Sequence, residues 1–307
     1  MDNSTATSRN AILYPIAAYA IWGILPIYWK LMRQIPAGDI LAHRIFWSFV
    51  FLGIVLSAMR RWGELRHIFR SKRTFFAVAA ASILISVNWL TYIWAVNSNH
   101  IVEASLGYYI NPLLTIMLGA IVLREKTDGW QVAAIVLAFI GVGYLTYQFG
   151  SVPWVALTLA VSFGLYGLAK KLSSLTPLTG LAAETMMVAP LALAFLVAST
   201  NSSATYSNLS YGMYALILLT GVVTSVPLLL FAQGAQRVSL TTLGFVQYLS
   251  PSISLLIGIY LYNEPFTLAH RVSFGCIWLA LLMYTLSRRE VRARLASIGA
   301  FANKKRG

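Results

Sequence analysis

The residues of this chain that could do chemistry are a few polar and ionisable side chains set inside long apolar stretches. Such groups are costly in a bilayer, and they usually face the protein interior or a water-filled cavity, where they bind a solute, exchange a proton or form an ion pair. They are His43, Arg44, Asn88, Glu103, Asn111, Glu184, Gln233 and Gln247. They are scattered single residues rather than a continuous polar ring.

Signatures of catalysis and of cofactor binding are absent from the sequence. There is no glycine-rich phosphate loop, so we expect no ATP hydrolysis by this chain. There is no His-Glu-x-x-His motif and no cysteine cluster, and the one cysteine is Cys276. We therefore expect no metal site, no cofactor, no catalytic residues and no enzymatic activity.

Arg44 and Glu184 occupy nearly equivalent positions in the two halves of the chain, and each has a candidate partner of opposite charge. Arg44 and Glu103 are expected on one side of the membrane, and Glu184 and Arg237 on the other. One hypothesis is that these pairs form gating latches that open alternately. The alternative is that Glu103 favours a helix N-terminus through the dipole and Arg44 extends to the lipid head groups.

Two of these groups could couple transport to a proton gradient. Glu184 lies inside an apolar run, and the imidazole of His43 titrates near neutral pH, so either could exchange protons. A packed imidazole is the simpler interpretation of His43.

A second kind of chemistry comes from aromatic residues beside these amides, which could stack on an aromatic or cationic ligand. Aromatic residues near the ends of membrane helices are more often interface anchors, which is the simpler interpretation of Trp94. The candidates for a substrate cavity are Asn88, Trp89, Tyr92, Tyr108, Asn111, Gln247, Tyr248 and Ser250.

The elements that position these residues are membrane helices. Apolar residues make up 58% of the 307 and charged residues only 10%, whereas soluble domains carry about 25% charged residues. Apolar runs of helix-spanning length recur between short polar loops. They predict ten spans, at 11–31, 41–58, 75–96, 101–123, 130–147, 151–169, 179–199, 211–235, 240–262 and 270–287.

The net charge of +14 has a topological explanation. If the N-terminus is cytoplasmic, all but four of the 23 basic residues fall on the cytoplasmic side. The exceptions are Lys30, Arg33, Arg44 and Arg271. This asymmetry follows the positive-inside rule, so we expect both termini in the cytoplasm of a bacterium and no nucleic-acid partner.

The chain contains an internal repeat. Pro251 follows Pro112 by 139 residues, and the same offset aligns Gly119 with Gly258, Glu125 with Glu264 and Asn111 with Ser250. Because five spans lie in each half, the second half enters the membrane in the opposite orientation, and a substrate site is expected near the midplane between the halves.

The two prolines predict broken helices at that depth. Each proline removes a backbone hydrogen bond, and freed backbone inside a membrane must be buried in protein or line a cavity. We therefore expect the helices around Pro112 and Pro251 to line one central cavity, framed by the third, fourth, eighth and ninth spans. Simple packing kinks are the alternative.

Several segments resemble one transporter family. IWGILPIYWK, AHRIFWSF, NWLTYIWAVN, EASLGYYINPL, VSFGLYGLAKK, VPLLLF and TLGFVQYLSP are similar to the RarD-type branch of the EamA transporters, in the drug/metabolite transporter superfamily. NEP at 263–265 departs from the GE pair that is frequent there.

The resemblance implies an all-α integral membrane protein of ten transmembrane helices in two inverted five-helix EamA repeats, 11–147 and 150–287. Residues 1–10 would be a cytoplasmic N-terminus and 288–307 a basic cytoplasmic tail. It also implies transport of a small molecule across the inner membrane, and the family name carries an association with chloramphenicol.

The expected function is secondary transport by alternating access. The cargo would be a small polar or amphipathic metabolite (amino-acid-like, aromatic or drug-like), moved by export. The expected partners are this substrate, the lipid bilayer and protons as a coupling ion, and a homodimer is compatible with the sequence. The main alternative is a passive channel, which would need a continuous polar ring through the pore. A lipid-modifying enzyme is disfavoured by the missing catalytic groups.

Overall fold

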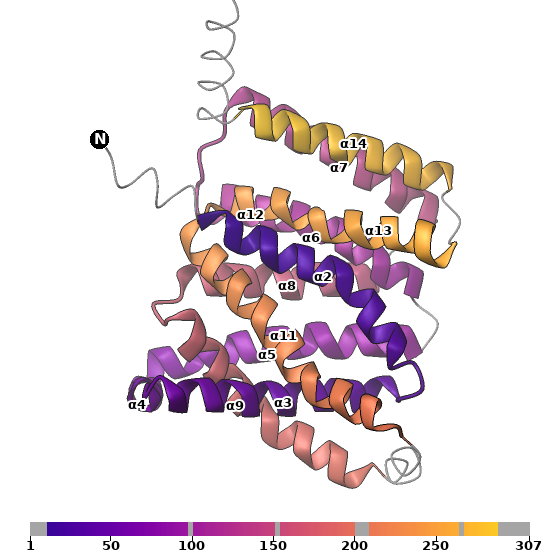
Figure 1. The fold of residues 1–307 in the computed structure, drawn as a ribbon. Helices are drawn as coiled ribbons and strands as arrows, with labels where there is room; N and C mark the ends of the chain where they lie inside the picture. The colour runs from indigo at the N-terminus through magenta and orange to yellow at the C-terminus, as the bar shows by residue number, and fades with distance from the viewer. Residues whose placement is uncertain (1–10, 98–100, 151–153, 200–208, 264–266, 288–307) are drawn as a thin grey trace, which may run out of the picture.

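The computed structural model describes residues 11–97, 101–150, 154–199, 209–263 and 267–287, and its regular structure there is entirely α-helical (Figure 1). The helices are α2 (Leu13–Leu31), α3 (Ala37–Ala58), α4 (Trp62–Arg70), α5 (Lys72–Asn97), α6 (Ile101–Ile121), α7 (Gly129–Phe149), α8 (Trp154–Leu172), α9 (Pro177–Ala198), α11 (Tyr211–Arg237), α12 (Leu240–Gln247), α13 (Leu249–Tyr262) and α14 (Leu268–Ser287). The all-α architecture predicted from the sequence is confirmed.

Membrane-length helices account for most of this list. Nine stretches of the described chain are long and apolar enough to cross a membrane, with α12 and α13 counting together as Leu240–Tyr262. α2 is not among them, because its prolines Pro15 and Pro26, its aromatic residues and Lys30 lower its hydropathy. α2 nevertheless lies among the other helices, packed against α11 and α13 (Figure 1). Together these elements occupy the ten predicted spans.

α4 is a helix where the sequence predicted only a polar loop. Its residues Leu65 and Ile68 stand one turn apart and are buried in the main core, while basic residues face outward. At its start, Arg61 Nε lies 2.6 Å from Glu64 Oε1. A short amphipathic helix therefore covers the ends of the spans on this side.

The packing of the helices is symmetric between the two halves of the chain. The repeat relates α2 to α8, α3 to α9, α5 to α11, α6 to α12 and α13, and α7 to α14. α6 packs on α8 as α13 packs on α2, and α5 packs on α8 and α9 as α11 packs on α2 and α3. The pairs α3–α9, α6–α12 and α7–α14 map onto themselves. Exchanging the halves therefore preserves these contacts, as a two-fold relation between repeats requires, whereas the packing of α8 on α11 has no counterpart of similar extent between α2 and α5.

The line of symmetry runs through the crossing of α6 with α12. Tyr248 Oη donates to the carbonyl oxygen of Tyr109 at 3.4 Å, and these two tyrosines are separated by 139 residues, the repeat offset. Gly244 permits the close approach there, because a Cβ atom at this position would lie 2.7 Å from the Pro112 carbonyl oxygen. The prolines predicted to mark the repeat thus lie at the contact between the halves.

Candidate substrate cavity

A cavity of about 430 Å³ lies between the two halves, lined by residues of α2, α3, α5, α6, α8, α11, α12, α13 and α14. Its volume falls in the range of small-molecule sites, about 300–1,000 Å³. Most of the residues predicted for a substrate site are brought together around it. Those that line it are Asn88, Trp89, Tyr92, Tyr108, Asn111, Gln247, Ser250 and Pro251, together with the gating candidate Arg44.

The repeat symmetry is visible in the lining itself. Asn111 on α6 and Ser250 on α13 are equivalent positions, and both line the cavity. The same holds for Tyr108 and Gln247, which are the residues four positions before Pro112 and Pro251. A proline displaces the carbonyl four residues earlier, so the two prolines free backbone acceptors at cavity-lining residues.

Tyr248 and Pro112 do not line the cavity. Tyr248 is 1% exposed and its hydroxyl group is used against Tyr109, so its predicted place in the substrate site is replaced by a packing role. Trp94 is exposed, with its ring 5.0 Å from that of Trp154, which agrees with an interface anchor.

The two helices that contain Pro112 and Pro251 differ in the structure. Tyr248 separates α12 from α13, three residues before Pro251. α6 instead runs through Pro112 without interruption, so the predicted break there is wrong. Around Pro112, Gly244 lies against the Pro112 carbonyl oxygen, and Thr115 Oγ1 donates to the Asn111 carbonyl oxygen at 3.1 Å.

Asn88 joins the helices that form the cavity wall. Its Nδ2 donates to the Leu159 carbonyl oxygen at 2.9 Å and to Ser162 Oγ at 3.0 Å, which connects α5 to α8. Asn88 therefore holds α5 and α8 in position relative to each other, in addition to lining the cavity.

Two buried polar atoms of the lining lack a partner among the described residues. Asn111 is 6% exposed and Tyr19 is 2% exposed. Neither Asn111 Oδ1 nor Tyr19 Oη makes a hydrogen bond in the described part of the chain. Because a buried polar group without a partner is costly, these atoms mark where a bound solute or water would be stabilised.

Arg44 brings a positive charge to the cavity from α3. Its Nε donates to Thr224 Oγ1 on α11 at 3.1 Å. Its guanidinium carbon lies 4.7 Å from the ring centroid of Trp29 and 5.2 Å from that of Trp89. The predicted partner Glu103 has its side chain outside the described residues, so that latch stays a prediction.

Glu184 has a different partner from the predicted one. Lys170 on α8 forms a buried ion pair with it, and Tyr166 Oη donates to its other oxygen at 3.0 Å. Arg237 instead lies over the ring of Tyr14, 5.0 Å from its centroid. The predicted Glu184–Arg237 latch is therefore wrong, because α8 supplies a nearer cation from inside the bundle.

His43 does not line the cavity, although it precedes Arg44 in the chain. It is half-buried on α3, and Asp39, one helical turn earlier, interacts with it electrostatically. This environment is compatible with the packed imidazole that was the simpler interpretation.

Several aromatic residues of the cavity wall were not predicted from the sequence. Tyr19, Trp22 and Trp29 of α2 and Phe163 of α8 also line the cavity. The rings of Trp22 and Phe163 meet edge to face, with centroids 5.8 Å apart. The available signal was the spacing of Tyr19, Trp22 and Trp29, which are three and then seven residues apart and so share one face of a helix, a pattern equally typical of a packed core.

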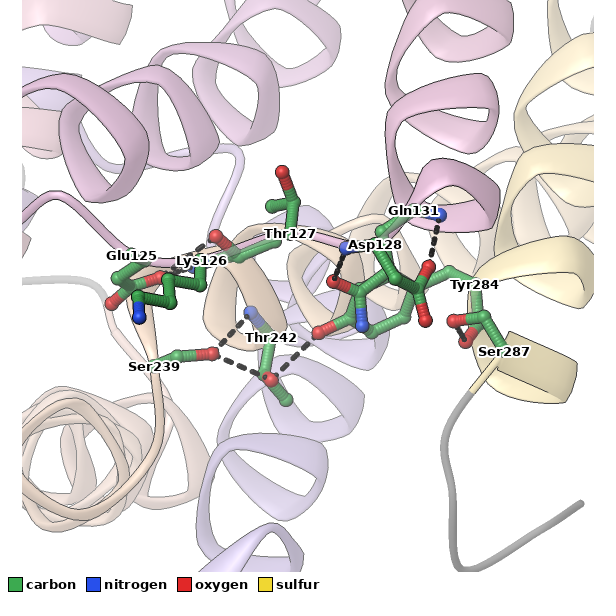
Figure 2. A pocket seen from close by; sticks show the side chains of 10 residues that line it. Glu125, Lys126, Thr127, Asp128, Gln131, Ser239, Thr242, Tyr284 and Ser287 are labelled. Atoms are coloured by element: carbon green, nitrogen blue, oxygen red, sulfur yellow. Dashed lines mark hydrogen bonds between the residues drawn. The ribbon is translucent and has the colours of Figure 1, made fainter.

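A second cavity of about 480 Å³ lies where α12 begins and α14 ends, and its lining is polar (Figure 2). Glu125 belongs to it and accepts three hydrogen bonds from the other half: Leu240 N at 2.6 Å, Thr241 N at 2.9 Å and Thr241 Oγ1 at 2.7 Å. This carboxylate caps the N-terminus of α12. Most of the other lining polar groups bond one another, such as Thr242 with Ser239 and Tyr284 (Figure 2).

Membrane-length helices in two repeats that enclose a polar and aromatic cavity define a multi-pass transport protein. The EamA-like transporter family matches this chain twice, at residues 9–147 and 151–286. The chain belongs to that family, so it is a membrane transporter rather than an enzyme, and the predicted family is confirmed.

Individual relatives agree with this assignment. The chain is 47% identical over 287 residues to the Bacillus subtilis protein "Uncharacterized transporter YojE", covering 92% of this chain and 96% of the relative. It is 41% identical over 280 residues to "Protein RarD" of Escherichia coli K12, covering 91% and 95%. A solved crystal structure that is 18% identical superposes with a TM-score of 0.70 over 90% of this chain and 98% of its own, which supports the fold alone.

Proposed function

We propose that this protein is a secondary carrier that moves a small polar or amphipathic metabolite by alternating access, with the central cavity as its substrate site. The observation that carries the proposal is the cavity between the repeats, lined by equivalent residues of both halves such as Asn111 and Ser250. The unpartnered Asn111 Oδ1 and Tyr19 Oη supply the polar contacts that such a site needs.

An asymmetry along the helices supports alternating access. The cavity reaches Trp29 near the end of α2, and Tyr262 and His270 beside the α13–α14 connection. At the opposite ends of the helices, Glu125 binds the first residues of α12 and joins the two halves directly. We infer that these bonds keep this end of the path closed while the cavity lies toward the other end, as expected for one state of a carrier.

The membrane and the direction of transport are part of the proposal. The basic residues of α4 and its flanks lie at the same ends of the spans as Glu125, and the positive-inside rule assigns that side to the cytoplasm. We infer a bacterial cytoplasmic membrane, both termini in the cytoplasm, and export from that side. Coupling to protons, with Glu184 or His43 as the exchanging group, and a homodimer stay predictions; in the structure Glu184 is paired with Lys170.

Solute counterflow in proteoliposomes tests this function. Vesicles containing the purified protein are preloaded with one unlabelled compound and then given a trace of the same compound with a label. The compounds would be amino acids, aromatic metabolites and chloramphenicol. A carrier accumulates the label transiently above its equilibrium level, and empty vesicles do not. Flux that never exceeds equilibrium would instead identify a passive channel.

A further inference from the structure

We infer that the substrate of this cavity is an aromatic monocarboxylate whose carboxylate binds Arg44. The inference rests on the proposed function, because it names the ligand class of the same site. It follows from the one permanent charge in the described lining, from the aromatic wall around that charge and from the unpartnered acceptors beyond it.

Arg44 has donors that the protein does not use. A guanidinium group carries five N–H donors in a planar fork. Only Nε has a described acceptor, Thr224 Oγ1 at 3.1 Å. The rings of Trp29 and Trp89 lie against the guanidinium and hold its orientation. The two terminal nitrogens are thus left to form the paired hydrogen bonds that match a carboxylate.

The charge of Arg44 has no carboxylate partner among the described residues. The ion pairs found there are Arg61 with Glu64 and Lys170 with Glu184. The described lining of the cavity contains no Asp or Glu. Burying an unpaired cation among apolar groups costs free energy, and an anionic ligand that pairs with Arg44 removes this cost. An anion should therefore bind more tightly here than a neutral or cationic ligand of the same size.

The rest of the lining limits the ligand to a single negative charge on an aromatic body. Arg44 is the only arginine or lysine in the described lining, so a dianion would keep one charge unpaired. A ligand ammonium group would likewise find no described carboxylate. The rings of Trp22, Tyr108 and Phe163 form walls on which an aromatic group can stack.

The unpartnered acceptors add one further requirement. Asn111 Oδ1 and Tyr19 Oη are buried and line the same cavity. A ligand with an N–H or O–H group on its aromatic body would donate to one of them and remove the cost of leaving it unpaired. An indole bearing a carboxylate side chain meets all three conditions.

Four indoles of similar size and different charge test the inference. They are indole-3-acetate (an anion), indole-3-acetamide (neutral), tryptophan (a zwitterion) and tryptamine (a cation). Affinity is measured calorimetrically on the purified full-length protein at pH 8, and counterflow is measured with labelled indole-3-acetate. We expect indole-3-acetate to bind about 10- to 100-fold more tightly than the amide, the factor typical of a hydrogen bond to a charged group. Tryptamine should be the weakest.

Variants of Arg44 assign the preference to this residue. Arg44→Gln should reduce the preference for the acetate over the amide to about one, and Arg44→Lys should give an intermediate value because lysine lacks the planar fork. Arg33→Gln is the matched control, since Arg33 is exposed and lies outside the lining. Because the readout is a ratio of two affinities, it is insensitive to a general loss of folded protein.

A variant of Glu103 separates substrate binding from the predicted latch. If Arg44 serves only to pair with Glu103, then Glu103→Gln and Arg44→Gln should impair all four probes alike, which would overturn the inference. Equal binding of acetate and amide by the unaltered protein, or binding of none of the probes, would also overturn it. Counterflow of another solute would then still support the proposed carrier function. Binding of indole-3-acetate without any counterflow would support carboxylate binding by Arg44 and refute the carrier function.

Discussion

Replacing Glu184 by glutamine should destabilise the protein by about 3–5 kcal/mol, because it leaves a lysine charged and unpaired in the interior. Lys170 is 3% exposed and Glu184 is 4% exposed, and Tyr166 Oη completes the cluster at 3.0 Å. For a chain of this length, such a loss lowers the melting temperature by roughly 5–10 °C. The measurement is thermal unfolding of the purified protein in detergent, followed by intrinsic fluorescence.

Two further variants make this result specific. Glu64→Gln breaks the half-exposed pair with Arg61 and should cost at most about 1 kcal/mol. The double change Lys170→Met with Glu184→Leu removes both charges and should recover much of the lost stability. If Glu184→Gln melted with the unaltered protein but abolished gradient-driven transport, the structural role would be refuted, and proton exchange at Glu184 would be the better explanation.

Three other variants test separate parts of the structure. Gly244→Ala should lower the melting temperature, because its Cβ would lie 2.6 Å from Ile116 Cγ1. The control Gly275→Ala should be neutral or stabilising, because a Cβ there meets no atom within 4 Å. Equal effects of the two changes on the melting temperature would contradict the close crossing of α6 and α12. Asn111→Leu should reduce counterflow roughly tenfold. It should not lower the melting temperature, because Asn111 Oδ1 has no hydrogen-bond partner among the described residues. Unchanged counterflow would show that Asn111 Oδ1 does not contact the substrate. Arg61 lowers the pKa of Glu64 below its ordinary value of 4.5. The unaltered protein should therefore be more stable than Glu64→Gln well above pH 4.5, and this stability difference should disappear as the pH falls through the lowered pKa. A stability difference that persists in acid would contradict this pairing.

Hydropathy and charge were sufficient to predict the spans, because a bilayer forces each crossing to be a long apolar helix with satisfied backbone. The repeat offset was equally informative, since Pro112 and Pro251 mark equivalent helices. From those helices the sequence located much of the cavity lining, including Tyr108, Asn111 and Ser250.

The partners of charged residues could not be predicted in the same way. Lys170 was counted with the cytoplasmic charges, and only the rotation of α8 against α9 turns it inward towards Glu184. The close approach of Gly244 to the Pro112 carbonyl oxygen was likewise not predicted from the sequence. Contacts of this kind depend on how each helix is rotated about its axis relative to its neighbours, and a hydropathy pattern specifies that rotation poorly.

The central claim is that the cavity between the repeats is the transport path, and Ser250 offers the most direct test. Cys276 is the only cysteine, so Cys276→Ser gives a background in which a single new thiol can be labelled. Ser250→Cys places that thiol in the cavity lining, and Ser252→Cys places it on the same helix against Trp278, whose Nε1 donates to Ser252 Oγ at 2.9 Å. The account predicts that a bulky thiol reagent blocks counterflow through Ser250→Cys, that substrate protects against the block, and that labelled Ser252→Cys still transports. Full transport by labelled Ser250→Cys, or an equal block at both positions, would contradict it.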